Sequence, residues 1–125
     1  MPPDRYLVAG CTPWARRVFD KTISKFPGEW EYCDRPEHSG EYSDTTGLDY
    51  MVGARPDYKY IFFLHWRWKV PKEITDKYTC IGFHLGRLPE QGGGSPLQWR
   101  ILEGHDRATL SMFRMTDRID EGNVI

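Results

Sequence analysis

The stretch RYLVAGCTPWARRVFDKTISKFPG, residues 5 to 28, predicts how this chain begins to fold. It opens with a short apolar run, which is typical of a buried strand. Thr12 then suits an N-cap, Pro13 suits the first turn of a helix, and Gly28 can end that helix. One apolar face follows from the three- and four-residue spacing of Ala15, Val18, Phe19, Ile23 and Phe26. A strand that leads into a helix is the first half of a βαβ unit.

The same alternation continues along the chain. Further strands are expected in four segments: EWEYC (29–33), YIFFLHW (60–66), CIGFH (80–84) and ATLSMFRM (108–115). Helices are expected in three segments: LDYMVGARPDY (48–58), as a short helix that breaks before Pro56, VPKEITDKY (70–78) and SPLQWRILEG (95–104). This order predicts an α/β fold with a mostly parallel sheet flanked by helices. Ligands of such sheets bind at the carboxyl ends of the strands.

Length and composition predict one small globular domain over residues 1–125. The 17 Lys+Arg residues are scattered among 18 Asp+Glu residues, with a net charge of -1, which disfavours a nucleic-acid partner. Three widely spaced cysteines (Cys11, Cys33 and Cys80) fit neither a disulfide framework nor a zinc site, so we expect reduced thiols and no metal. The N-terminus lacks a signal pattern and no apolar run reaches membrane-spanning length, so we expect a cytoplasmic protein.

The segment IGFHLGRLPEQGGGSPLQW, residues 81 to 99, places His84 at the end of an expected strand. A glycine-rich loop that opens a helix leaves backbone N–H groups available to a ligand. A lone histidine at a strand end is more often structural, and glycine triplets also form simple flexible turns. The combination nevertheless favours an active-site loop.

Two other features could carry chemistry. Asp120 follows the last expected strand and could act with a histidine in proton transfer, although turns commonly contain aspartate. HWRWKVP, residues 65 to 71, continues from the end of the strand expected at 60–66. It could line a site for a flat heteroaromatic ligand. Alternatively, its tryptophans could pack in the core. Cys11 lies near a helix start, where a buried inert thiol is the plainer interpretation. The turn after residues 5–9 has no G-x-G-x-x-G pattern, which argues against a nicotinamide or flavin enzyme.

Together these segments resemble the folate-dependent formyltransferase family. The resemblance covers residues 56 to 125, through GFHLGRLPEQGGGSPLQWRILEG and ATLSMFRMTDRIDEGNVI. It implies a three-layer, Rossmann-like domain of the formyltransferase type and a minimal member of the family. It implies 10-formyltetrahydrofolate as the donor, tetrahydrofolate as its product, and a small-molecule amine as acceptor. A homodimer is left open.

The resemblance also implies roles for particular residues. His84 and Asp120 match the family's catalytic histidine and aspartate. The folate-contacting positions are Arg67, Trp68, Lys69, Leu88, Pro89, Met115 and Asp117. The loop that faces the substrate includes Gly82, Gly92, Gly93, Gly94 and Ser95. The family pattern has asparagine two residues before the histidine, and here Gly82 occupies that position.

We therefore expect an N-formyltransferase that acts on a small amine, in the first instance an amino sugar carried on a nucleotide. Two alternatives remain. One is a folate-binding module or partner subunit that kept the pocket and lost the chemistry, which Gly82 favours. The other is a general α/β domain without a folate site.

Overall fold

The computed structural model describes residues 2–38, 47–85 and 110–116. The chain forms two compact units, Met1–Trp68 and Lys69–Ile125. The helix predicted at 95–104 lies outside the described residues. The single domain predicted over 1–125 also stays a prediction.

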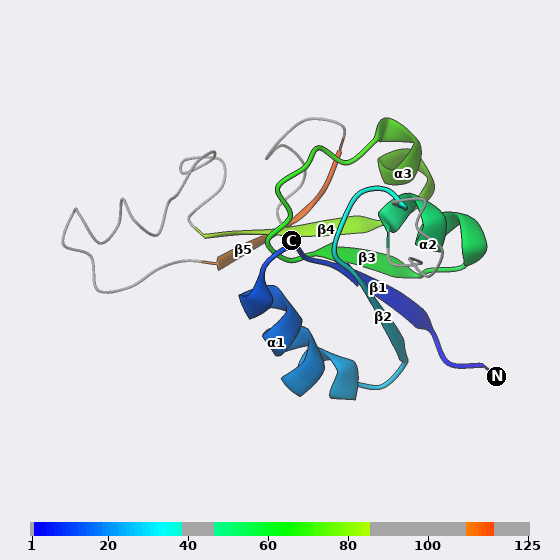
Figure 1. Cartoon of the computed structure of the whole chain (residues 1–125). Helices are drawn as coiled ribbons and strands as arrows, with labels where there is room; N and C mark the ends of the chain where they lie inside the picture. Colours follow the sequence, from blue (N-terminus) through cyan, green and yellow to red (C-terminus); the bar gives the residue numbers. More distant parts are fainter. Residues whose placement is uncertain (1, 39–46, 86–109, 117–125) are drawn as a thin grey trace, which may run out of the picture. The chain divides into compact units, whose positions relative to one another are not determined.

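The first unit is a three-stranded parallel sheet with helices (Figure 1). Its elements are β1 Arg5–Ala9, α1 Pro13–Lys21, the 3-10 turn η1 Ile23–Lys25, β2 Glu29–Cys33, α2 Leu48–Ala54 and β3 Tyr60–Phe63. The central strand is β1, which pairs in parallel with β2 on one side and β3 on the other. Tyr6 is thereby in register with both Trp30 and Tyr60. All three predicted strands of this unit are confirmed.

The second unit contains α3 Lys72–Lys77, β4 Cys80–Leu85 and β5 Leu110–Arg114. Pro71 is the N-cap residue of α3, which lies within the helix segment predicted at 70–78. The strands β4 and β5 are antiparallel, with Gly82 opposite Phe113 and His84 opposite Ser111. The predicted strands at 80–84 and 108–115 are thus confirmed. Both pairings in the first unit are parallel, which agrees with the predicted fold class.

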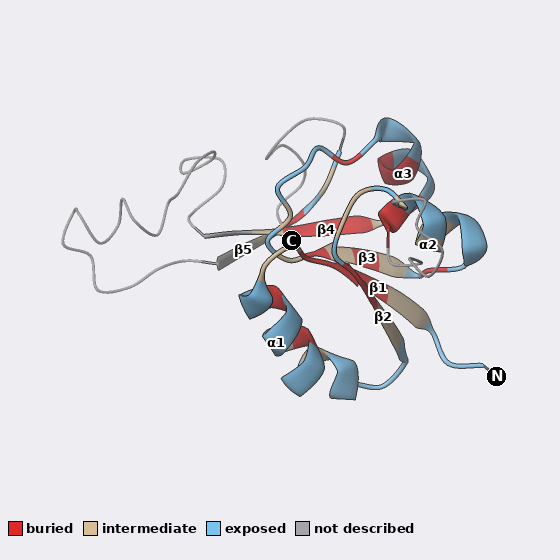
Figure 2. Cartoon of the chain, viewed as in Figure 1, coloured by how far each residue is buried: buried red, intermediate tan, exposed pale blue. Residues whose placement is uncertain are grey.

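The start of α1 follows the prediction and its end does not. Thr12 caps the helix through its Oγ1, which accepts a hydrogen bond of 3.1 Å from the N–H of Ala15. Ala15 and Phe19 form the buried side of the helix (Figure 2). The helix ends at Lys21, because Thr22 leaves the helical conformation with φ -129° and ψ -61°. Phe26, expected on the apolar face, is 57% exposed.

Gly28 has a different role from the predicted helix end. Its φ of +118° lies in the region that favours glycine, at the turn into β2. A Cβ at this position would lie 2.6 Å from the ring of Tyr6. The ring of Tyr6 in turn stacks on Trp30 with centroids 4.5 Å apart and faces Tyr60 at 6.2 Å. These aromatic side chains form a ladder across the three strands, which stabilises their pairing.

The two faces of the sheet in the first unit bury different side chains. On one face, Val8 packs with Phe19 and Tyr32, and this cluster extends to half-buried Phe62 and Leu64. Successive side chains in a strand point to opposite faces. The other face therefore carries a second set of fully or almost fully buried residues: Leu7, Ala9, Cys33, Ile61 and Phe63. This near-continuous burial is typical of a parallel strand covered on both sides.

The turn between β1 and α1 requires glycine at position 10. A Cβ there would lie 2.7 Å from the carbonyl oxygen of Leu64, 2.7 Å from the hydroxyl of Tyr32 and 2.9 Å from Cβ of Ala15. Residues from β1, β2, α1 and the exit of β3 therefore converge at one backbone position.

We expect Gly10→Ala to lower the free energy of unfolding by about 1–3 kcal/mol, the usual cost of overpacking. The matched control is Gly53→Ala in α2, where a Cβ would meet no atom within 4 Å. That change should raise stability by up to about 1 kcal/mol, because alanine is the better helix former. Urea denaturation followed by circular dichroism measures both. Similar effects of the two substitutions would contradict this account of Gly10.

Candidate functional site

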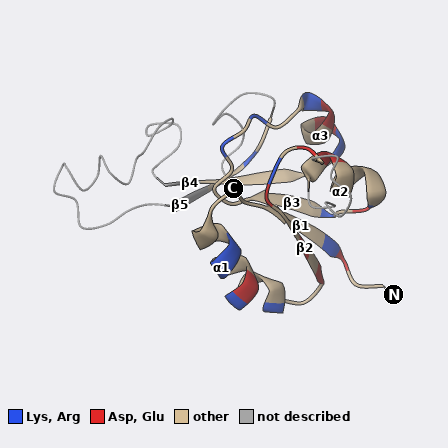
Figure 3. Ribbon diagram, viewed as in Figure 1, with Lys and Arg blue, Asp and Glu red and all other residues tan. Residues whose placement is uncertain are grey.

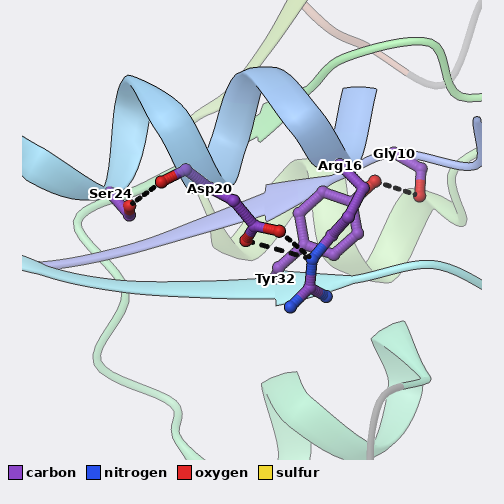
Figure 4. Close-up of polar contacts among 5 residues, drawn as sticks. All are labelled: Gly10, Arg16, Asp20, Ser24 and Tyr32. Carbon is purple, nitrogen blue, oxygen red and sulfur yellow. Dashed lines mark hydrogen bonds and ion pairs between the residues drawn. The ribbon is translucent and has the colours of Figure 1, made fainter. Parts of the chain in front are cut away.

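Tyr32 holds the turn at the carboxyl end of β1 (Figure 4). Its hydroxyl donates a hydrogen bond of 2.9 Å to the carbonyl oxygen of Gly10. The guanidinium of Arg16 lies 4.8 Å from the centre of the Tyr32 ring and pairs with Asp20 at 3.1 Å. Burial raises the pKa of Tyr32 from 10.0 to about 12, against the smaller opposite effect of Arg16. The phenol is therefore a neutral donor at physiological pH.

The segment that leaves β3 is bonded to this turn. The N–H of Leu64 donates to the carbonyl oxygen of Ala9 at 2.7 Å, and the N–H of Cys11 donates to that of His65 at 3.1 Å. The Sγ of Cys11 also donates to the carbonyl of His65, at 2.8 Å. The carboxyl ends of β1 and β3 are thus joined by main-chain hydrogen bonds, at the edge of the sheet where α/β folds bind ligands.

His65 is the one non-glycine residue with positive φ in the described part of the chain, at +58°. Its Nδ1 lies 3.3 Å from the hydroxyl of Thr12. Its ring packs at 5.1 Å from that of Trp14, tilted by 47°. Sequence reasoning placed His65 only as the first residue of an aromatic segment. Neither its backbone conformation nor its contacts with residues more than fifty positions away could be read from that segment.

The two tryptophans of the aromatic segment have different environments. The ring of Trp66 is half-buried and meets Phe63 edge-on at 5.6 Å. Trp68 is 38% exposed, meets Trp66 edge-on at 5.0 Å, and has the guanidinium of Arg67 at 5.6 Å. Core packing thus accounts in part for Trp66. Trp68 and Arg67 retain surface for a flat ligand.

In the second unit, Gly82 is buried beneath Phe113 from the opposite strand. A Cβ at position 82 would lie 2.6 Å from Cζ of Phe113 and 3.1 Å from Cγ of Met115. The N–H of Met115 donates to the carbonyl of Cys80 at 2.8 Å, which continues the β4–β5 pairing. An aromatic ring over a glycine in the neighbouring strand compensates for the missing side chain. Any side chain at position 82 would have to displace that ring.

The remaining predicted site residues are covered only in part. His84 is the next-to-last residue of β4, and positions 82 and 84 share one face of that strand because they are two residues apart. The side chain of His84 lies outside the described part of the structure. The same holds for eight whole residues: Leu88, Pro89, Gly92, Gly93, Gly94, Ser95, Asp117 and Asp120. Lys69 is exposed, at the start of the second unit.

A surface depression of about 890 Å³ lies elsewhere in the first unit. It is lined at the amino-terminal end of the strands, with Arg5 at the start of β1 and Asp57 before β3. Its charged groups pair with one another: Arg5 with Asp57 at 3.2 Å, and Arg55 with Glu31 at 2.9 Å. We do not assign the active site to this depression, because its charges are mutually neutralised and it lies at the end of the strands opposite to the β1–α1 turn.

The charged residues of α1 and the three cysteines are further ionisable groups of the chain. The helix α1 carries three basic residues and one acidic residue, Arg16, Arg17, Lys21 and Asp20 (Figure 3). All three cysteines are free. Burial raises the pKa of Cys80 to about 12 and raises that of Cys33 more, so both thiols stay protonated.

No group of three His, Cys, Asp or Glu residues in the described ranges could hold a metal ion. Within those ranges, no helix combines the length and apolarity needed to cross a bilayer.

The raised pKa of Tyr32 predicts a loss of stability at high pH. In the unfolded chain the phenol ionises near pH 10.0, whereas in the folded protein it ionises near pH 12. Rising pH therefore favours the unfolded state between these values. The stability advantage of the wild type over Tyr32→Phe should shrink across that window, as measured by urea denaturation at each pH. A constant difference would contradict the assignment.

The packing of Gly82 against Phe113 predicts coupling between the two positions. Gly82→Ala should cost about 1–3 kcal/mol in the wild type, because the methyl group meets the ring. In a Phe113→Leu background most of that cost should disappear. A double-mutant cycle measured by urea denaturation gives the interaction energy. Additive effects would show that the ring does not limit position 82.

Comparison with known proteins extends the resemblance. No family model matches the chain. It is 34% identical over 58 residues to the methionyl-tRNA formyltransferase of Bacillus cytotoxicus, which is 45% of this chain and 18% of that protein. The same enzyme from Bacillus cereus is 36% identical over an equal length and equal shares of the two chains.

Solved structures give the same result for the fold. The methionyl-tRNA formyltransferase from Clostridium thermocellum matches 97% of this chain and 50% of its own, with 27% identity and a TM-score of 0.69. A sugar N-formyltransferase from Shewanella matches 97% of this chain and 55% of its own, with 16% identity and a TM-score of 0.65. HypX from Aquifex aeolicus, in complex with tetrahydrofolic acid, matches 96% of this chain and 20% of its own, with 19% identity and a TM-score of 0.71.

The chain thus spans about half the length of the solved formyltransferases that it matches, and it aligns with less than a fifth of the curated relatives. The predicted α/β, formyltransferase-type fold is confirmed. The chain is thus similar to formyltransferases in sequence over 58 residues and in fold, which agrees with the family that the resemblance over residues 56 to 125 predicted.

Proposed function

We propose that this protein transfers a formyl group from 10-formyltetrahydrofolate to a primary amine. The observation that carries the proposal is the exposed Trp68 with the guanidinium of Arg67 beside it, on the segment that follows the carboxyl end of β3. This is the edge of an α/β sheet where ligands bind. A pterin is a flat heteroaromatic group, and a tryptophan face beside a guanidinium is suited to such a group.

The donor would be held by the residues that the resemblance implies. Arg67, Trp68 and Lys69 would contact the pterin from the segment after β3. The rest of the implied set is Leu88, Pro89, Met115 and Asp117. HypX from Aquifex aeolicus, which shares this fold, has been solved in complex with tetrahydrofolic acid, and this supports folate as the ligand class.

Chemistry at the formyl carbon requires two functions from the protein. His84 would donate a hydrogen bond to the oxygen that gains negative charge as the amine attacks. The carboxylate of Asp120 would stabilise the protonated imidazole of His84. It would also take up the proton that the amine releases. The loop that contains Gly92, Gly93, Gly94 and Ser95 would shape the acceptor side of the site.

For the acceptor, we propose an amino sugar carried on a nucleotide. The relatives by fold include enzymes named for methionyl-tRNA and enzymes named for sugars, so the fold alone does not choose between them. The near-neutral charge of this chain favours a small acceptor over a nucleic acid. One relative, PseJ from Anoxybacillus kamchatkensis, has been solved in complex with a UDP-linked formamido sugar and tetrahydrofolate.

One observation favours a second candidate function, a folate-binding module without turnover. Position 82 has no side chain to donate a hydrogen bond, and the ring of Phe113 fills the space that such a side chain would need. Loss of one oxyanion donor typically lowers the rate by about two to three powers of ten. A protein with this site could keep folate binding and lose catalysis.

Two measurements on the same variants distinguish the candidates. Formyl transfer from 10-formyltetrahydrofolate to a nucleotide-linked amino sugar, and titration calorimetry with a stable folate analogue, should be run on wild type, His84→Ala, Trp68→Ala and the control His38→Ala. The enzyme predicts that His84→Ala loses at least about a hundredfold in kcat with folate affinity retained. Trp68→Ala should weaken folate binding about tenfold, as expected for loss of a stacking ring, while His38→Ala changes neither quantity.

Other results would point elsewhere. Folate binding without transfer in the wild type would support the binding module. The absence of heat with the folate analogue would contradict both candidates and leave an α/β domain without a folate site. Transfer to methionyl-tRNA in place of the sugar would retain the enzyme and correct the acceptor.

A further inference from the structure

His65 is held through both its main chain and its ring by residues of the β1–α1 turn. Its carbonyl oxygen accepts from both the N–H and the Sγ of Cys11, at 3.1 and 2.8 Å. Its Nδ1 is 3.3 Å from the hydroxyl of Thr12, which also accepts from the N–H of Ala15. In the neutral tautomer in which Nδ1 accepts from the Thr12 hydroxyl, the ring proton is on Nε2. The ring nitrogen that remains for a ligand is Nε2.

His65 has a backbone conformation that is unfavourable for most residues, with φ at +58°. A positive φ is uncommon outside glycine, and strained residues of this kind occur preferentially at ligand sites. His65 is nevertheless exposed, so its conformation does not serve to bury the side chain. It lies two residues before Arg67, on the segment assigned above to the pterin.

A flat, exposed surface adjoins His65. The indole of Trp14 packs on the imidazole at 5.1 Å, yet 48% of Trp14 is exposed. Arg17 is exposed and three residues further along α1, so it neighbours Trp14 on the helix surface. Trp14 and His65 thus present an aromatic face beside an imidazole, and Arg17 adds a guanidinium from a neighbouring position on the surface of α1. This is the chemistry that binds an aromatic anion.

We propose that Trp14, His65 and Arg17 bind the nucleotide portion of the acceptor. The base stacks on Trp14, while Nε2 of His65 and the guanidinium of Arg17 donate hydrogen bonds to phosphate oxygens. The proposal rests on the proposed function for the identity of the acceptor, but its ligand can be tested without formyl transfer. A free anion would not need the indole, and an uncharged aromatic ligand would not need the guanidinium.

The test is titration calorimetry of the full chain with UDP, with uridine and inorganic diphosphate as partial ligands. Trp14→Leu should weaken UDP binding about tenfold or more, in the range expected for loss of base stacking, and Trp14→Phe should restore most of it. His65→Asn should also weaken binding about tenfold, because asparagine tolerates the same backbone conformation without the imidazole. The matched controls are Phe26→Leu and His38→Asn, an exposed aromatic and a second histidine of the same unit, which should bind as the wild type does.

Each other outcome is decisive. UDP binding that is absent in the wild type, or equal in all variants, overturns the proposal and leaves folate-dependent transfer untouched. Diphosphate that binds as tightly as UDP without dependence on Trp14 identifies an anion site only and overturns it as well. UDP binding that depends on Trp14 and His65 in a protein that binds no folate analogue supports the nucleotide site and contradicts the proposed function. Thermal denaturation of each variant confirms that it is folded.

Discussion

The close approach at Gly10 is the constraint on which the first unit depends. The carbonyl of Leu64, the hydroxyl of Tyr32 and the methyl of Ala15 all lie where a side chain at this position would begin. Because nothing larger than hydrogen fits, β1 can turn directly into α1 while it remains against both neighbouring strands. The hydrogen bond from Tyr32 to the Gly10 carbonyl then fixes the turn from the side of β2. Cys11 and Thr12 follow directly after Gly10, so this turn positions both of them beside His65.

The chain uses glycine in two different ways. At position 10, the absent side chain lets main-chain segments meet and so positions the residues around them. At position 82, the absent side chain makes room for the ring of Phe113 from the adjacent strand. Gly10 thus shapes the turn after β1, whereas Gly82, in the proposed site, is a position without a side chain that could donate a hydrogen bond. This contrast is why transfer and simple folate binding both remain candidate functions.

Sequence patterns predicted the elements well where the signals are local. Thr12 caps α1 because its hydroxyl needs only the N–H three residues later, and the apolar runs at residues 5–9 and 60–63 became strands. The end of α1 was predicted wrongly, because Gly28 serves a turn and the exposed Phe26 has no core to join. The resemblance over residues 56 to 125 pointed to formyltransferases, to which the chain is similar in sequence and in fold, and composition and periodicity alone could not have done this.

The parts that could not be predicted from the sequence depend on contacts between distant segments. The conformation of His65 follows from bonds to Cys11 and Thr12, and no property of HWRWKVP indicates those partners. The burial of Gly82 beneath Phe113 depends on the antiparallel register of β4 and β5. Within the aromatic segment, alternation alone could not decide that Trp68 would be the more exposed tryptophan.

The strand pairings also determine how the chain can reach this structure. In β1, Arg5 pairs with Glu29 and Tyr6 with Tyr60, and in the second unit Gly82 pairs with Phe113. None of these pairs can form as a tight hairpin, so each must close a long loop before its contacts offset the lost chain entropy. The capped helix α1 is the element of the first unit that local interactions favour from the outset. Assembly of the parallel strands around β1 is therefore expected to limit the folding rate, as in other topologies of high contact order.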